Sequence, residues 1–210
     1  MDLTIRDSDV LLVVDLQNDF CPGGALAVDE GDAIVPVVNA LARRFPHVVL
    51  TQDWHPVGHI SFANTHGREA FEEIQLEHGP QTLWPEHCVQ ATEGAAFHRA
   101  LEVAEAELIL RKGFRVGVDS YSAFLENDHL TPTGLAGYLR ERGLGRLFCC
   151  GLAYDYCVRH SAVDGRHLGF EVAVIEDACG AVNLGGSVEA ANAAFAEHRI
   201  PRVMATELLR

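Results

Sequence analysis

The sequence lacks any apolar run long enough to cross a bilayer. Its longest continuous apolar stretches, such as residues 10–14 and 172–175, are short, whereas a membrane-spanning helix needs about 20 such residues. The first residues are mixed and acidic, without the basic stretch and apolar core that mark a secretory signal. We therefore expect a cytoplasmic protein with no membrane partner.

Positive charge is also scarce. The 210 residues include 16 Lys and Arg against 30 Asp and Glu, so the formal net charge is −14. Binding to nucleic acid or to an anionic membrane depends on clustered Lys and Arg that neutralise phosphates. This charge balance argues against a nucleic-acid partner.

Cysteine is present without the spacing of a disulfide framework. No Cys-x-x-Cys pair occurs among the six cysteines, and a chain of this length can bury a core without disulfides. We expect reduced thiols. The composition, 48% apolar and 22% charged, is that of a globular protein, and the length favours a single domain over residues 1–210.

Short β-branched runs alternate with helix-like stretches along the chain. The predicted strands are residues 10–14, 48–51, 108–110, 147–150, 172–175 and 203–205. Their lack of polar alternation is typical of strands buried on both faces of a parallel sheet. The predicted helices are residues 34–44, 95–106, 133–142, 157–168 and 187–198. This order predicts an α/β fold, a three-layer αβα domain with a mostly parallel central sheet of about six strands.

Residues 60–93 interrupt this alternation. The segment is polar, marked by Gly and Pro, and has no long apolar period. Irregular segments of this length in a compact domain are usually functional or disordered. The composition of its last part, WPEHC at residues 84–88, argues against disorder, so we expect a functional segment.

Chemically active side chains follow predicted strands at their carboxyl ends, where open parallel sheets bind ligands. Asp15, Lys112 and Cys157 lie at three of these ends. Cys157 begins a predicted helix, whose positive end would lower the pKa of the thiol and whose free N–H groups could hold an oxyanion. The three side chains would supply a nucleophile, a proton acceptor and a cation. The alternative is a buried structural ion pair beside an unrelated cysteine.

A second group of side chains has the character of metal ligands. Asp53 and His55 are two residues apart, so they project to the same side of a strand. His87 could complete a set of two imidazoles and one carboxylate with open positions, which suits zinc, iron(II) or manganese. An Asp-x-His pair is a weak signal by itself, and His59 and His66 are neighbouring competitors.

Five motifs, taken in order, resemble the nicotinamidases of the isochorismatase-like cysteine hydrolase family. They are DLQNDFC at residues 15–21, TQDWHP at 51–56, WPEHC at 84–88, RKG at 111–113 and GLAYDYCV at 151–158. The resemblance implies an amidohydrolase that converts nicotinamide and water to nicotinate and ammonia through a cysteine thioester, in NAD salvage. It also implies activity on pyrazinamide.

The resemblance also implies a role for each matching position. Cys157 is then the nucleophile, Asp15 the general base and later acid, and Lys112 the positioning cation. One divalent metal ion, zinc ahead of iron or manganese, falls on Asp53, His55 and His87. The remaining implied positions are the oxyanion donors, which are the backbone N–H groups of Ala153 and Cys157 beside a cis peptide at Leu152–Ala153, and the substrate-binding aromatics Phe20, Trp84 and Tyr121.

This sequence departs from some members of the family at one point. Those members use a further His after the Asp-x-His motif as a metal ligand, but here the register of His59 differs. We therefore leave His59 out of the predicted ligand set.

Two other functions stay open at the level of sequence. One is another hydrolase on the same scaffold, such as an isochorismatase, although a metal set is not expected there. The other is a protein that binds metal or nicotinamide without catalysis, which would have no need of a nucleophile. A redox role for Cys157 lacks a resolving thiol nearby. Assembly into a homo-oligomer stays open as well.

Overall fold

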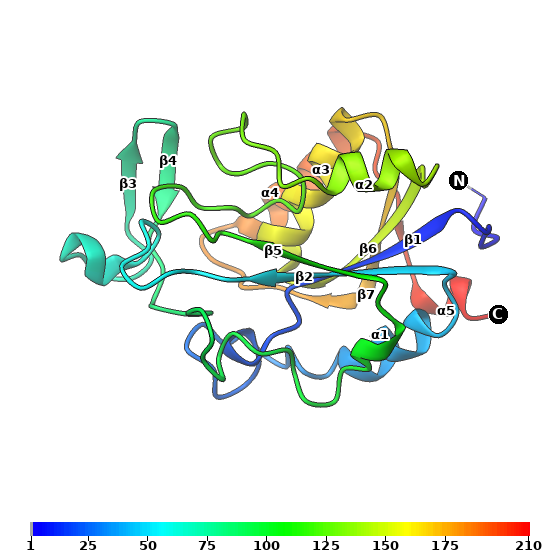
Figure 1. Cartoon of the computed structure of the whole chain (residues 1–210), viewed down its shortest axis with the longest axis horizontal. Helices are drawn as coiled ribbons and strands as arrows, with labels where there is room; N and C mark the ends of the chain where they lie inside the picture. The colour runs from blue at the N-terminus through cyan, green and yellow to red at the C-terminus, as the bar shows by residue number, and fades with distance from the viewer. Residues whose placement is uncertain (1) are drawn as a thin grey trace.

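A six-stranded parallel sheet forms the centre of the computed structural model, which describes residues 2–210 (Figure 1). The strand order is β5-β2-β1-β6-β7-β8, and each neighbouring pair is parallel. The strands are β1 (Asp9–Val14), β2 (His47–Asp53), β5 (Leu108–Lys112), β6 (Arg146–Leu152), β7 (Glu171–Gly180) and β8 (Arg202–Val203). The predicted α/β class and six-stranded sheet are confirmed.

Helices cover both faces of this sheet (Figure 1). One face packs against α1 (Val35–Ala42) and α5 (Ala205–Leu208), and the other against α2 (Leu135–Glu141), α3 (Arg159–His167) and α4 (Ser187–Glu197). Alternate side chains of β1 enter two separate cores, one on each face of the sheet, and all six positions of the strand are buried. This explains the continuous apolar runs in the sequence.

The helix predicted over residues 95–106 is wrong. The segment consists mainly of turns and bends, with one isolated β-bridge from Phe97 to Gln17 and a short 3-10 turn, η3 (Val103–Glu105). The Ala95 carbonyl accepts hydrogen bonds from Gln17 Nε2 at 2.9 Å and from Gln52 Nε2 at 2.8 Å. These long-range bonds replace the helical ones, so tertiary contacts override the helical periodicity.

Two smaller differences concern the chain ends and the irregular segment. The last strand stops at Val203, and Ala205 begins α5 instead. Residues 60–93 contain a 3-10 turn, η2 (Ala63–His66), and an antiparallel hairpin of β3 (Glu73–Leu76) and β4 (Gly79–Thr82). The hairpin lies at the end of the molecule opposite both termini (Figure 1). Within residues 2–210, no helix is both long and apolar enough to span a bilayer.

Candidate active site

Three strand ends bring the predicted catalytic trio together. Asp15 follows β1, Lys112 ends β5, and Cys157 lies in the turn after β6. Lys112 Nζ is 2.8 Å from Asp15 Oδ2 and 3.4 Å from Cys157 Sγ. All three side chains are buried. A nucleophile, a carboxylate and an ammonium group therefore share one water-poor site.

Asp15 is held in an uncommon backbone conformation. Its φ is +44°, and such strain in a residue other than glycine clusters at functional sites. Thr51 Oγ1 donates to Asp15 Oδ1 at 2.6 Å and accepts the Asp15 N–H at 3.1 Å. The other oxygen, Oδ2, faces Lys112. An oxygen of Asp15 and the Cys157 sulfur lie within 4.8 Å of each other.

The charge on Lys112 is stabilised by its surroundings. Lys112 Nζ lies 2.5 Å from Asp53 Oδ1 and donates to the Ser120 carbonyl at 2.8 Å. Burial would lower the pKa of Lys112, but the carboxylates of Asp15 and Asp53 outweigh it and raise the pKa well above its usual range. Lys112 is therefore an ammonium ion between two carboxylates.

For the nucleophile and the base, the effect of burial on the pKa outweighs that of the neighbouring charges. Burial raises the pKa of the Cys157 thiol well above its usual range, against the attraction of Lys112, and it raises the pKa of Asp15 too. The predicted lowering of the Cys157 pKa by a helix end is therefore wrong. Cys157 lies inside a π-helical turn, Tyr154–Val158, that precedes α3 rather than at the start of a regular helix. The resting thiol is neutral, so attack requires a base.

The three predicted metal ligands also meet. Asp53, His55 and His87 each offer one ligand atom within 4.8 Å of the others. Asp53 Oδ2 lies 3.4 Å from His55 Nε2 and 3.9 Å from His87 Nε2. Since Oδ1 of the same carboxylate binds Lys112, Asp53 joins the metal set to the trio.

The hydrogen bonds of the two imidazoles suit metal binding. His55 Nδ1 pairs with the Gly113 carbonyl at 2.8 Å, and His87 Nδ1 with the Pro85 carbonyl at 2.7 Å. Nδ1 must be the donor in both rings, so in the neutral form of each ring Nε2 carries the lone pair that can bind a cation. Burial lowers the pKa of His87 to about 4, which keeps this ring neutral.

The carboxylate in this set carries the complementary charge. Burial would raise the pKa of Asp53, but Lys112 and the two imidazoles outweigh it and lower the pKa below its usual range. Burial would likewise lower the pKa of His55, but Asp53 raises it. The carboxylate thus favours positive charge beside the imidazoles, and the donor set fits a divalent cation.

A competing set of His55, His59 and Asp119 is also within 4.8 Å. Both ring nitrogens of His59 already have protein partners, however, because Nδ1 pairs with Ser61 Oγ at 2.8 Å and Nε2 with the Val118 carbonyl at 3.2 Å. His59 is therefore less available as a ligand than His87, whose Nε2 has only Asp53 Oδ2 beside it.

A narrow pocket opens between the trio and the metal set, with about 350 Å³ of unfilled space. The predicted aromatics Phe20, Trp84 and Tyr121 all line it. Its other lining residues are Leu26, Asp53, His55, His87, Asp119, Ala153, Tyr156, Cys157 and Val182. Among those that the sequence reasoning missed, Tyr156 had a usable signal as the neighbour of Cys157. Leu26, Asp119 and Val182 had none, because each lies in an irregular segment outside the five motifs.

The aromatic walls of the pocket stand at right angles. Trp84 and Tyr156 have ring centroids 4.9 Å apart at an interplanar angle of 86°. Trp84 Nε1 donates to the Tyr121 hydroxyl at 3.1 Å, which holds the third ring in place. Faces and edges arranged in this way form a slot for a flat ring.

The backbone before the nucleophile supplies a free donor. The Leu152–Ala153 peptide is cis, and the Ala153 carbonyl accepts from the N–H groups of Tyr156 and Val158 at 3.1 Å each. Within residues 2–210, the Ala153 N–H itself donates to no protein acceptor. It is therefore available to an oxygen atom in the pocket.

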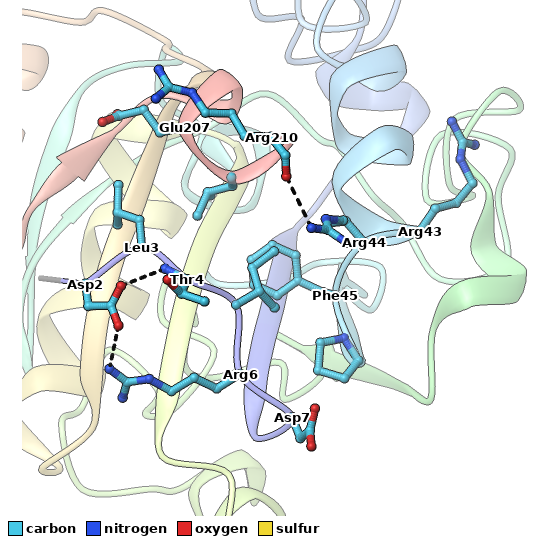
Figure 2. A pocket seen from close by; sticks show the side chains of 13 residues that line it. Asp2, Leu3, Thr4, Arg6, Asp7, Arg43, Arg44, Phe45, Glu207 and Arg210 are labelled. Atoms are coloured by element: carbon cyan, nitrogen blue, oxygen red, sulfur yellow. Dashed lines mark hydrogen bonds and ion pairs between the residues drawn. The ribbon is translucent and has the colours of Figure 1, made fainter.

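A larger hollow, with about 1380 Å³ of open space, lies beside the chain termini (Figure 2). Its charged side chains do not converge: Arg44 donates to the Arg210 main-chain oxygen at 3.2 Å, Arg6 pairs with Asp2 at 3.7 Å, and Arg43 points away. The chemistry of the molecule is therefore concentrated in the smaller pocket.

Known proteins resemble this chain over nearly its whole length. The family model described as "Isochorismatase domain" matches residues 9–207. A nicotinamidase of Acinetobacter baylyi is 48% identical over 200 residues, which cover 95% of this chain and 94% of that protein.

Solved structures show the same likeness. A nicotinamidase/pyrazinamidase of Acinetobacter baumannii has a TM-score of 0.96 at 50% identity, covering 97% of this chain and 99% of that one. A pyrazinamidase of Pyrococcus horikoshii, solved in complex with zinc, has a TM-score of 0.76 at 37% identity, covering 94% and 99%.

Proposed function

The chain belongs to the isochorismatase family, and we propose that within it this protein converts nicotinamide and water to nicotinate and ammonia through a cysteine thioester, in NAD salvage. The observation that carries this function is the contact of Lys112 with both Asp15 and Cys157, where Cys157 also lines the pocket with aromatic walls. The 48% identity to a nicotinamidase supports it, and the pyrazinamidase relatives support activity on pyrazinamide. Residues 1–210 form one hydrolase domain in this proposal, supported by the match over residues 9–207.

The pyridine ring of the substrate occupies the slot between Phe20, Trp84 and Tyr121. Asp53, His55 and His87 would hold one divalent ion, which we take to be zinc because the donor set suits it and a related structure contains it. When bound, this ion would supply a Lewis acid to the ring nitrogen of the substrate. The carboxamide then lies toward Cys157.

The first chemical step forms a carbon–sulfur bond. Asp15 takes the proton of the Cys157 thiol while the sulfur attacks the carboxamide carbon. The raised pKa of Asp15 makes it a better base, and Lys112 stabilises the negative charge as it forms. The carbonyl electron pair moves to the oxygen, which accepts hydrogen bonds from the Ala153 and Cys157 N–H groups.

The remaining steps break the carbon–nitrogen bond and then the carbon–sulfur bond. The oxyanion re-forms the carbonyl group, Asp15 gives its proton to the departing nitrogen, and ammonia leaves a thioester on Cys157. Asp15 then takes a proton from water, whose oxygen attacks the thioester carbon. The carbon–sulfur bond breaks, the proton on Asp15 returns to the Cys157 sulfur, and nicotinic acid leaves and loses its carboxyl proton to water as nicotinate, which restores the starting state.

Ammonia release from nicotinamide and pyrazinamide by the purified protein tests this proposal, with the consumption of isochorismate measured separately. We expect steady turnover of nicotinamide and pyrazinamide, and none of isochorismate. Nicotinamide binding without ammonia release would instead indicate a binding protein. Turnover of isochorismate alone would indicate another reaction on the same scaffold.

Removal of the metal should act mainly on substrate binding. We expect chelation to raise the KM for nicotinamide by at least ~10-fold, about 1.4 kcal/mol of lost binding, with a smaller change in kcat, because the ion holds the ring rather than the amide. Added zinc should restore the KM. His87→Ala should reproduce the effect, whereas the control His66→Ala should not, since His66 binds the Ile60 carbonyl outside this set. A loss confined to kcat would contradict a positioning metal.

A further inference from the structure

Two loops distant in sequence meet in the wall of the pocket. Phe20 ends a 3-10 turn, η1 (Asn18–Phe20), after β1, whereas His87 lies in the loop after β4. Their rings touch edge to face, with centroids 5.4 Å apart. A ring-binding side chain and a metal-binding side chain thus depend on how these two loops are held together.

Asp19 joins the two loops. It belongs neither to the catalytic trio nor to the metal set. Its Oδ2 accepts the Cys88 N–H at 2.7 Å, directly after His87, and its Oδ1 accepts the Ala25 N–H at 3.2 Å. Cys88 has a φ of +46°, an uncommon conformation for a residue other than glycine. The bond from Asp19 stabilises the backbone at the point where His87 is presented.

Gly94 provides the space for this carboxylate. A Cβ atom at Gly94 would lie 2.1 Å from Asp19 Oδ2 and 2.5 Å from Oδ1, far inside contact distance. The φ of Gly94 lies outside the left-handed range that favours glycine. The Asp19 N–H also donates to the Gly94 carbonyl at 3.0 Å. Gly94 therefore packs directly against the bonded carboxylate.

We propose that Asp19 is a positioning residue that holds the His87 imidazole in its metal-binding place and keeps Phe20 packed against it. The inference rests on the proposed function in taking His87 as a metal ligand. Residues behind a metal ligand commonly change metal affinity by 10–100-fold when they are replaced. Asp19 acts through the Cys88 N–H in this way, and it touches neither the metal nor the reacting atoms.

Zinc titration of the metal-free protein tests the proposal without any assay of activity. We expect Asp19→Ala to weaken Zn²⁺ binding by ~10–100-fold and to raise the KM for nicotinamide more than it lowers kcat. Asp19→Asn keeps an oxygen that can accept the Cys88 N–H, so it should recover most of the Zn²⁺ affinity. Asp177→Ala is the matched control, because Asp177 accepts the Ala205 N–H in a similar long-range bond outside the pocket.

Gly94→Ala tests the hydrogen bond from the Cys88 N–H to Asp19 without changing Asp19 itself. The added Cβ should displace the Asp19 carboxylate and so weaken Zn²⁺ binding as Asp19→Ala does. In the Asp19→Ala background the clash is gone, so the double variant should bind Zn²⁺ no more weakly than Asp19→Ala alone. Such non-additivity is the signature of two residues that act through one contact.

Two results would overturn the proposal. One is wild-type Zn²⁺ affinity in both Asp19→Ala and Gly94→Ala, and the other is full additivity of their effects. If the first of these results came with a lower melting temperature, the role of Asp19 would be structural only. Failure of the wild-type protein to bind Zn²⁺ or release ammonia would instead count against the proposed function.

Discussion

Cys157→Ala is expected to abolish nicotinamide hydrolysis while leaving the pocket able to bind nicotinamide. Without the sulfur no thioester can form, so kcat should fall by ~10⁴-fold or more. The rings and the metal set do not involve the thiol, so the Kd for nicotinamide should change little. Ammonia release and calorimetric titration measure the two quantities, and mass spectrometry of the quenched wild-type protein should detect a nicotinoyl group on Cys157.

Cys150→Ala is the matched control for the loss of a buried thiol. Cys150 lies in β6, is fully buried and does not line the pocket. Its replacement should lower stability but leave turnover per folded molecule unchanged. Substantial hydrolysis by Cys157→Ala would exclude the covalent route.

Lys112→Met is expected to lower both stability and activity. The substitution leaves Asp15 and Asp53 buried without the cation that lies 2.8 Å from one and 2.5 Å from the other. Removing one partner of a buried ion pair typically costs about 3–5 kcal/mol of unfolding free energy. Turnover should also be lost, because Lys112 no longer stabilises the thiolate. Denaturant unfolding and ammonia release measure the two effects.

Arg146→Met separates these two roles of Lys112. Arg146 forms a buried ion pair with Asp9, and neither residue lines the pocket. Its loss should therefore destabilise the protein to a similar degree while folded molecules keep full turnover. If folded Lys112→Met also retained wild-type turnover, the ion pair of Lys112 would be purely structural, and the thiol would need another source of stabilisation.

The trio was accessible to sequence reasoning because of a general property of parallel sheets. All strands of such a sheet end at the same edge, so polar residues that follow buried strands converge there. Asp15, Lys112 and Cys157 meet for this reason. Asp53 and His55 were accessible because side chains alternate along a strand.

Prediction from the sequence fails where segments distant in the chain form hydrogen bonds with each other or exclude water together. The helix predicted over residues 95–106 is absent, because Gln17 and Gln52 bond to the Ala95 carbonyl. The pKa of Cys157 rises rather than falls, because burial outweighs the attraction of Lys112. Neither effect can be predicted from the few residues that surround Ala95 or Cys157 in the sequence.

By itself, the sequence determined the six-stranded α/β sheet, the residues that could react and those that could bind a metal, because strand burial and side-chain alternation are local patterns. The tertiary structure alone decided that both ring nitrogens of His59 are hydrogen-bonded, how Trp84, Tyr121 and Tyr156 form a slot, and how Asp19 joins two loops. These outcomes depend on contacts between residues far apart in the chain, whose energies no local pattern encodes.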